Sequence, residues 1–370
     1  VHFCNAEGDL LLSLQHEISD DCFVYPLAVD EDGVLVGADS AYSREPRGVI
    51  KFDGEMGEVL WYYETGAGAS RALPADLDGD GKLEVIPNWN TLHNGHEVYQ
   101  GTPQHTTDGD LYLVVVDDDG SSLLTKSYPQ PADGRARHRA FDSDGTGPLE
   151  ILAVEKHDRV FYPGKDRVRI YDLEGNLLHS YEGPDNEDWK FAVGDLEGDG
   201  TPEVVVGGYT VLTVLDRQLR EVRSVEENGF VHLVSDLTGD GKAEIVTVNK
   251  EGTLRVYNGE LRLIASTSLS TDEQVKLLAA DVNRNGSVEI IGSTKAGLHA
   301  FELLVYEFEP AEKTVVSRRP NETSRQWPEK PKSPPAYGSE LHFLGTTLEW
   351  NHEKNQPVLR VRPGERMRGG

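Results

Sequence analysis

Short runs in which apolar and polar residues alternate recur along this chain, and glycine or acidic turn residues separate them. Two such runs flank Asp118-Asp119-Gly120 within residues 111–126, and two more flank Asn258-Gly259 within residues 254–267. Similar pairs of runs occupy residues 168–181 and 211–225. Alternation with a period of two, bounded by such turns, predicts antiparallel strands joined as hairpins.

A nine-residue acidic segment, Asp76 to Glu84, lies between two of these apolar runs. Carboxylates stand at its first, third, fifth and ninth places, and Gly79 and Gly81 allow the sharp backbone turns of a tight loop. Oxygen ligands at alternate places suit a hard cation that takes roughly six to eight oxygens. The segment is too short for the helical calcium loop, whose closing acid comes at its twelfth place. We therefore predict a hairpin loop closed on a metal ion.

The same spacing returns four more times, and we number the acidic loops in chain order. Loop 1 is 76–84, loop 2 is 142–150, loop 3 is 195–203, loop 4 is 236–244 and loop 5 is 281–289. Loop 3 keeps all four acidic places, whereas loops 2 and 4 each carry one threonine and loop 5 carries two amides and Arg284. Five loops with one spacing are a strong repeat signal, because chance does not reproduce it.

The repeats have the length of propeller blades. Counted from residue 30, where a shortened version of the unit begins, successive units start 41 to 66 residues apart. Four short strands in each unit of roughly 40–50 residues is the spacing of a β-propeller. We expect an all-β fold, a seven-bladed β-propeller of four-stranded antiparallel blades, with the last blade closed by both chain ends.

The chain ends define the expected domain boundaries. Residues 1–316 hold blades one to six and the N-terminal half of the closing blade, and the proline-rich 317–340 segment is a linker or surface wrap. Strands within 341–363 are expected to complete the closing blade, because the N-terminal hairpin needs two partner strands and this removes the free edge. Residues 364–370 form a tail.

Charge and composition restrict the function. The net charge of −28 over 370 residues argues against nucleic acid as a partner. No apolar run approaches 18 residues, so no membrane span is expected. Cys4 and Cys22 are either buried thiols or a disulfide. Weak calcium loops need calcium in roughly the millimolar range, which favours an extracellular, cell-surface or periplasmic location. The oligomeric state is not indicated.

Over residues 24–310 the acidic loops resemble the FG-GAP, or VCBS-type, repeats of calcium-binding β-propellers, the family that includes the integrin α-subunit head. In that family the metal ligands are loop places one, three, five and nine, with a backbone carbonyl at place seven. The resemblance implies structural Ca²⁺ at four loops and little or no metal at loop 5, where Asn283 and Asn285 replace carboxylates. The implied ligands are Asp76, Asp78, Asp80 and Glu84; Asp142, Asp144, Thr146 and Glu150; Asp195, Glu197, Asp199 and Glu203; and Asp236, Thr238, Asp240 and Glu244.

Ligand binding is expected on the face opposite these loops. Two long connections there, 87–109 and 155–165, belong to neighbouring blades, and long loops on a rigid scaffold are common binding sites. Four of the six residues that lie five places before a unit start are basic, and a ring of cations at a channel mouth would attract an anion. The alternative is that each cation pairs with a local carboxylate. The candidate ligand-binding residues are Arg71, Arg137, Lys190, Lys276, Trp89, His93, His96, Tyr99, His157 and Tyr162.

Two functions fit these features. The first is a non-catalytic binding module for an acidic glycan or protein. The second is a polysaccharide lyase that cleaves a uronate-containing polymer by β-elimination, because the 76–145 region resembles rhamnogalacturonan-type lyases. That reaction needs a cation on the uronate, for which Arg137 and Arg71 are candidates, and a base for the C5 proton, for which His138, His105 and Tyr99 are candidates.

Overall fold

The structure is a computed structural model of the 370-residue chain. It describes residues 2–4, 10–13, 22–30, 33–40, 47–54, 57–66, 68–90, 106–107, 110–128, 135–143, 149–156, 164–185, 187–269, 275–281, 288–294, 297–307, 337–343, 346–351 and 356–361. The regular elements of these residues are strands β1 to β28. Among them there is no helix long and apolar enough to cross a membrane.

Twenty-four of these strands form six groups of four that follow one another along the chain. Within each group the strands pair antiparallel with their sequence neighbours, as the hairpin pattern predicts. The first three groups are β3 (Cys22–Val29), β4 (Gly33–Ser40), β5 (Gly48–Asp53) and β6 (Val59–Glu64); β7 (Gly68–Ala75), β8 (Glu84–Asn90), β9 (Tyr112–Val116) and β10 (Ser122–Ser127); and β11 (Arg135–Phe141), β12 (Glu150–Lys156), β13 (Lys165–Tyr171) and β14 (Leu177–Asp185).

The next three groups repeat this order. They are β15 (Lys190–Gly194), β16 (Glu203–Gly207), β17 (Val211–Leu215) and β18 (Glu221–Glu226); β19 (Phe230–Ser235), β20 (Glu244–Val248), β21 (Thr253–Tyr257) and β22 (Leu263–Ser268); and β23 (Lys276–Ala280), β24 (Glu289–Thr294), β25 (Gly297–Glu307) and β26 (Tyr337–Phe343). The second and third groups also join at two residue pairs between β8 and β11.

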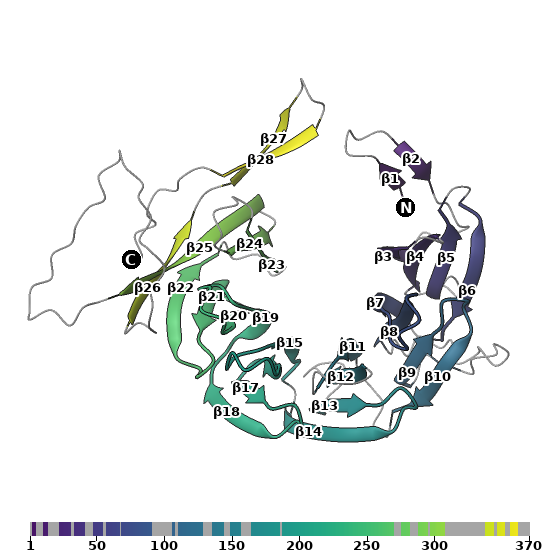
Figure 1. The fold of residues 1–370 in the computed structure, drawn as a ribbon, viewed down its shortest axis with the longest axis horizontal. Coiled ribbons are helices and arrows are strands. Elements are labelled where there is room, and N and C mark those ends of the chain that lie inside the picture. Colours follow the sequence, from purple (N-terminus) through teal and green to yellow (C-terminus); the bar gives the residue numbers. More distant parts are fainter. Residues whose placement is uncertain are drawn as a thin grey trace, which may run out of the picture.

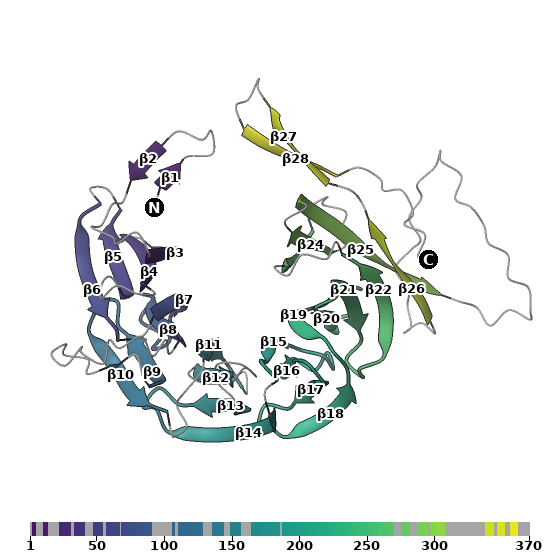
Figure 2. The same cartoon turned by 180° about the vertical axis from the view of Figure 1, so that it is seen from behind.

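The six sheets stand side by side along an arc around a common centre (Figures 1 and 2). The first strand of each group, such as β11, β15 or β19, lies nearest the centre, and the fourth strand, such as β6, β14 or β18, lies on the outer rim (Figure 1). Each acidic loop connects the first strand of its sheet to the second. Since neighbouring strands are antiparallel, these loops lie at one end of the strands, and the connections between second and third strands lie at the other.

The core lies between the sheets. In β16, Val204 and Val206 belong to a buried cluster shared with β12 and β13, whereas Val205 belongs to a cluster shared with β19 and β20. Successive side chains of a strand point to opposite faces, so a sheet that is covered on both faces needs apolar residues at every position. This explains why β16 reads Glu-Val-Val-Val-Gly and is buried throughout.

Side chains on the rim also bond one sheet to the next. The indole nitrogen of Trp61 on β6 donates to the backbone oxygen of Asp118, 2.8 Å away, in the β9–β10 turn. Lys126 on β10 donates to the backbone oxygen of Gly175 in the β13–β14 turn. Arg223 on β18 donates to the backbone oxygen of Gly259, 2.6 Å away, in the β21–β22 turn. In each case an outer strand holds the outer turn of the following sheet.

The chain ends differ in part from our expectation. β1 (His2–Cys4) pairs with β2 (Leu10–Ser13), and β27 (Thr346–Asn351) pairs with β28 (Gln356–Val361), as two hairpins at the two ends of the arc (Figure 1). We expected residues 341–344 in the closing blade, but 341–343 belong to β26, which is the fourth strand of the sixth sheet beside β25. The seventh blade and its closure by the chain ends stay predictions.

Candidate functional site

The acidic loops are organised by their closing glutamates. Glu84, Glu203 and Glu244 each begin the second strand of a sheet, and each is buried. Their Oε2 atoms accept the backbone N–H of the second loop residue, at 2.6 Å in loop 1, 2.9 Å in loop 3 and 2.8 Å in loop 4. A carboxylate on the strand thereby fixes the start of the loop and directs its second oxygen towards the loop interior.

In loops 1, 3 and 4 the first aspartate holds the backbone of the turn. In loop 3, Asp195 Oδ1 accepts the N–H groups of Gly198 at 2.6 Å and Asp199 at 3.2 Å, and its Oδ2 accepts that of Gly200 at 2.7 Å. Partial burial opposes ionisation of this side chain, but the backbone donors outweigh it and lower its pKa. The equivalent aspartates of loops 1 and 4 make the same pair of bonds to the two loop glycines.

The glycines at places four and six are needed for their backbone conformation. Gly198 and Gly200 have φ of 75° and 85°, and the glycines of loops 1 and 4 have similar values. A Cβ on Gly200 would meet no atom within 4 Å, so the restriction is on the backbone and not on space. In loops 1, 3 and 4 the repeated glycines therefore mark two left-handed residues, as a tight metal loop requires.

Loop 1 has the geometry of a cation site. Ligand oxygens of Asp76, Asp78 and Glu84 lie within 4.8 Å of one another. Glu84 is fully buried, and its Oε1 has no hydrogen-bond partner. Burial raises the pKa of this carboxyl, and the charges of Asp78 and Asp80 add to the rise. A buried acceptor facing other carboxylates is costly unless a cation is bound, so these residues fit a Ca²⁺ ion.

Loops 3 and 4 repeat this electrostatic pattern and contact each other. Burial raises the pKa of Glu203, with the charges of Glu197, Asp195 and Asp199 adding to it. Burial raises the pKa of Glu244 to about 8, and Asp240 and Asp236 contribute in the same direction. The N–H of Ala243 in loop 4 donates to the backbone oxygen of Asp195, 2.8 Å away, so the two loops share one end of the molecule.

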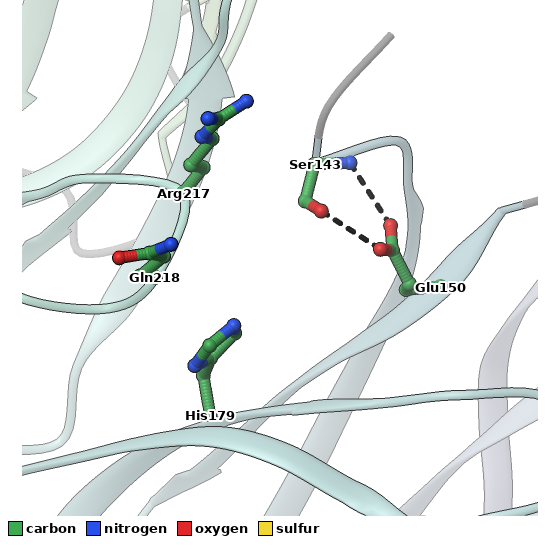
Figure 3. Close-up of a pocket in the computed structure, with 5 residues that line it drawn as sticks. All are labelled: Ser143, Glu150, His179, Arg217 and Gln218. Atoms are coloured by element: carbon green, nitrogen blue, oxygen red, sulfur yellow. Dashed lines mark hydrogen bonds between the residues drawn. The ribbon is translucent and has the colours of Figure 1, made fainter. Parts of the chain in front are cut away.

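Loop 2 is closed differently. Ser143 occupies its second place, and its N–H and Oγ donate to Glu150 Oε2 and Oε1 at 2.9 Å and 2.7 Å (Figure 3). The hydroxyl thus bonds Glu150 Oε1, whereas the equivalent oxygen in loop 1, Glu84 Oε1, has no partner. The sequence analysis missed Ser143, although a hydroxyl where loops 1, 3 and 4 have leucine was the available signal. Asp144 and Thr146 lie outside the described residues.

A polar pocket of about 280 Å³ adjoins loop 2 on the side of the following sheet. Ser143 and Glu150 line one side of it, His179 of β14 lies below, and Arg217 and Gln218 from the β17–β18 turn line the other side (Figure 3). Arg217 thus brings a guanidinium to the pocket that Glu150 also lines. In loop 5, Asn283 and Asn285 lie outside the described residues.

The four basic positions lie on the strands nearest the centre, Arg71 on β7, Arg137 on β11, Lys190 on β15 and Lys276 on β23. Lys190 and Lys276 begin their strands at the end opposite the acidic loops, whereas Arg71 and Arg137 lie further along theirs. Lys190 and Lys276 are exposed. Arg137 donates to the backbone oxygens of Trp89 and Ala136 at 3.3 Å and 3.2 Å. For Arg71 the structure describes the backbone alone.

Two of the proposed site residues belong to the interior. Trp89 is fully buried in the core beside Tyr112, with ring centres 5.6 Å apart, because β8 continues through Asn90 into the stretch that we expected to be a loop. His138 is also buried, and its Nδ1 and Nε2 lie 2.9 Å from Pro87 O and 2.7 Å from Tyr128 Oη. Burial lowers the pKa of His138 to about 3, so this imidazole is a structural group and not an accessible base.

The remaining candidates are not placed by the structure. The residues of the two long connections that were proposed for ligand binding or for proton abstraction lie outside the described residues: His93, His96, Tyr99, His105, His157 and Tyr162. Their roles in binding or proton abstraction therefore stay predictions.

Comparison with known proteins bears on the fold. No family model matches the sequence, and no curated protein matches it. The structure of the Dos1 propeller is similar to this chain with a TM-score of 0.51 and 12% identity, covering 80% of this chain and 71% of that one. BBS1N in its complex with ARL6DN has a TM-score of 0.49 at 8% identity, over 73% of this chain and 75% of that one. The Pan2 WD40 domain of Neurospora crassa has a TM-score of 0.45 at 12% identity, over 75% and 74% of the two chains. Together with the four-stranded sheets around a common centre, the likeness to the Dos1 propeller shows that this chain has a β-propeller fold.

Proposed function

We propose that this chain is a calcium-stabilised β-propeller of the FG-GAP type that binds an anionic glycan or protein in an extracellular, cell-surface or periplasmic setting. The observation that carries the calcium part is loop 1, where three carboxylates converge and the buried Oε1 of Glu84 has no partner. Loops 3 and 4 support it, because their closing glutamates are buried next to further carboxylates in the same way.

Calcium acts on stability in this proposal. All the side-chain ligands of a loop come from one hairpin, so an ion there cancels repulsion among carboxylates without taking part in a reaction. An ion that binds the folded chain alone stabilises it by about 2.7 kcal/mol when its free concentration is one hundred times the dissociation constant. The loops that hold an ion then keep the first two strands of their own sheets in register, while the opposite end is left for a ligand.

The binding part rests on the fold and on the position of the cations. Exposed Lys190 and Lys276 begin central strands in a chain with a net charge of −28, at the end opposite the loops. Such a concentration of positive charge favours an anionic ligand and predicts weaker binding at higher salt. Among the described residues no observation favours the lyase, because the one candidate base that the structure places, His138, is buried with both ring nitrogens in contact with oxygens.

Calcium titration of chelator-treated protein by isothermal calorimetry tests this proposal, with Mg²⁺ as the competing ion. We expect saturable Ca²⁺ binding and an increase in the free energy of unfolding. Asp78→Asn removes one ligand charge from loop 1 and is expected to weaken one site, whereas Asp119→Asn makes the same charge change in the neighbouring β9–β10 turn and leaves the binding unchanged. Absence of calcium binding, or equal effects of the two variants, contradicts the calcium part. Failure of every acidic glycan and acidic peptide in a panel to bind contradicts the binding part.

A further inference from the structure

Two lysines and three rings gather on the fourth and fifth sheets, at the end opposite the acidic loops. We name this group the aromatic–lysine cluster, and it consists of Lys190, Tyr209, Phe230, His232 and Lys250. Lys190 and Phe230 begin the central strands β15 and β19, Tyr209 lies in the β16–β17 turn, and Lys250 lies in the β20–β21 turn. The antiparallel order of the strands brings these positions to one end of two adjacent sheets.

The rings and ammonium groups alternate across the cluster. The Nζ of Lys250 lies 4.4 Å from the ring centre of Tyr209, and that ring meets Phe230 edge to face with centres 5.2 Å apart. The Nζ of Lys190 lies 5.5 Å from the ring centre of Phe230 and 3.1 Å from His232 Nε2. Both lysines are exposed and Tyr209 is partly exposed, whereas Phe230 is buried and supports the ring above it.

The turn that carries Tyr209 is held firmly. Glu187, which is 1% exposed, accepts hydrogen bonds from the N–H and the Oγ1 hydroxyl of Thr210, at 2.8 Å and 2.5 Å. The backbone oxygen of Gly208 accepts the N–H of Gly229 at 3.1 Å, which joins this turn to the next sheet. A Cβ on Gly208 would lie 2.3 Å from the backbone oxygen of Glu187, so the packing is close. A ring on such a turn is preorganised, and binding to it loses little conformational entropy.

Two carboxylates next to this turn have other partners. Glu187 is bonded to Thr210, and Glu227 is paired with Arg255. The nearest polar group to Lys190 within the cluster is His232, whose pKa is lowered to about 3 by burial and by the adjacent ammonium. A neutral imidazole accepts a hydrogen bond from Lys190 without cancelling its charge. Both ammonium groups therefore lie beside aromatic rings, in a chain with a net charge of −28.

We propose that the aromatic–lysine cluster binds a carboxylate-bearing sugar, a uronate residue of an acidic glycan. The face of Tyr209 would carry the C–H groups of the sugar ring, since the negative face of an aromatic ring attracts weakly positive hydrogens. Lys250 would leave that face for the sugar carboxylate, because a cation–π contact at an exposed site is weak. The ammonium of Lys190 would hold the charge of the adjoining sugar unit. This inference rests on the proposed function and narrows its ligand to a glycan.

Direct binding of a defined oligosaccharide tests the inference. The probes are a saturated oligogalacturonate and the methyl-esterified oligomer of the same length, which keeps the sugar rings and loses the charges. Calorimetry with the calcium-loaded full chain is expected to detect the first and to show at least roughly tenfold weaker binding of the second. Tyr209→Leu is expected to weaken oligogalacturonate binding by roughly tenfold, and Lys250→Gln to weaken it and reduce its salt dependence.

Arg262→Gln is the matched control, because it removes one positive charge from a 69% exposed side chain at the acidic-loop end of the fifth sheet. It is expected to bind like the parent, and unchanged urea unfolding midpoints show that each variant is folded. Parent-like affinity of Tyr209→Leu, or equal affinity for the charged and esterified oligomers, overturns the inference. So does an acidic peptide that competes for the same residues with equal affinity. Calcium titration of these variants reports separately on the proposed function.

Discussion

Glu244, which closes loop 4, gives a quantitative test of the link between the acidic loops and stability. Its side chain is 4% exposed, and burial, together with Asp240 and Asp236, raises its pKa from 4.5 to about 8. Without a cation, the folded protein keeps this proton across a range of pH in which the unfolded chain has lost it. The stabilising proton is therefore fully retained below pH 4.5, and stability falls as the pH rises from there through about 8. At about 1.4 kcal/mol per pH unit, the free energy of unfolding falls by about 5 kcal/mol over this pH range.

Glu244→Gln keeps an acceptor for the N–H of Leu237 and removes the ionisation. In chelator, the parent is expected to lose a few kcal/mol between about pH 5 and about pH 8 relative to the variant. Calcium is expected to reverse this order at about pH 8, because it binds loop 4 of the parent more tightly than loop 4 of the variant and therefore stabilises the parent more. Urea unfolding followed by tryptophan fluorescence, with and without calcium at each pH, measures all four free energies. Parallel pH profiles of the two proteins in chelator, or equal stabilisation of both by calcium, would refute the reasoning.

Three further substitutions test the loops and the interior. Asp195→Ala removes the acceptor of the N–H groups of Gly198, Asp199 and Gly200, and urea unfolding in chelator is expected to show a loss of about 1–3 kcal/mol that is independent of metal. Gly200→Ala is expected to lose about 1–2 kcal/mol from its φ of 85° alone, and a neutral effect in the same assay would contradict the assigned backbone conformation. His138→Phe leaves the hydroxyl of Tyr128 without its imidazole partner and is expected to lose about 1–3 kcal/mol at neutral pH. Burial lowers the pKa of this histidine from 6.5 to about 3, so the parent loses stability as the pH falls through that range. The difference in the free energy of unfolding between parent and variant should therefore shrink in acid, and a difference that stays constant would contradict this prediction.

Local patterns in the sequence were enough to predict most of the strands. The hairpins expected at 168–181 and 254–267 are confirmed as β13–β14 and β21–β22, because strand alternation and turn residues are properties of neighbouring positions. The two glycines of loop 1 were recognised for the same reason, and the glycines at places four and six of loops 1, 3 and 4 have positive φ values.

The errors concern contacts between distant residues. Trp89 and His138 look like binding-site residues when each is considered alone, but the pairing of β8 with β11 encloses them between sheets. Likewise, β26 joins β25 across a separation of about thirty residues, and no local signal near residue 341 indicates which sheet it completes. Lys250 and Tyr209 were missed because their proximity depends on the packing of two sheets.

The rim bonds from Trp61, Lys126 and Arg223 each tie one sheet to the next, and this has a consequence for how the protein comes apart. Among the six described sheets, an inner sheet has a neighbour on both sides and an outer sheet has a neighbour on one side. Coupling of this kind makes the series behave as a one-dimensional array. Fraying should then begin at the two ends and move inward, with the β15–β18 and β19–β22 sheets retaining their amide protons longest during hydrogen exchange. A contact that joins the two ends would therefore slow hydrogen exchange even in sheets that take no part in that contact.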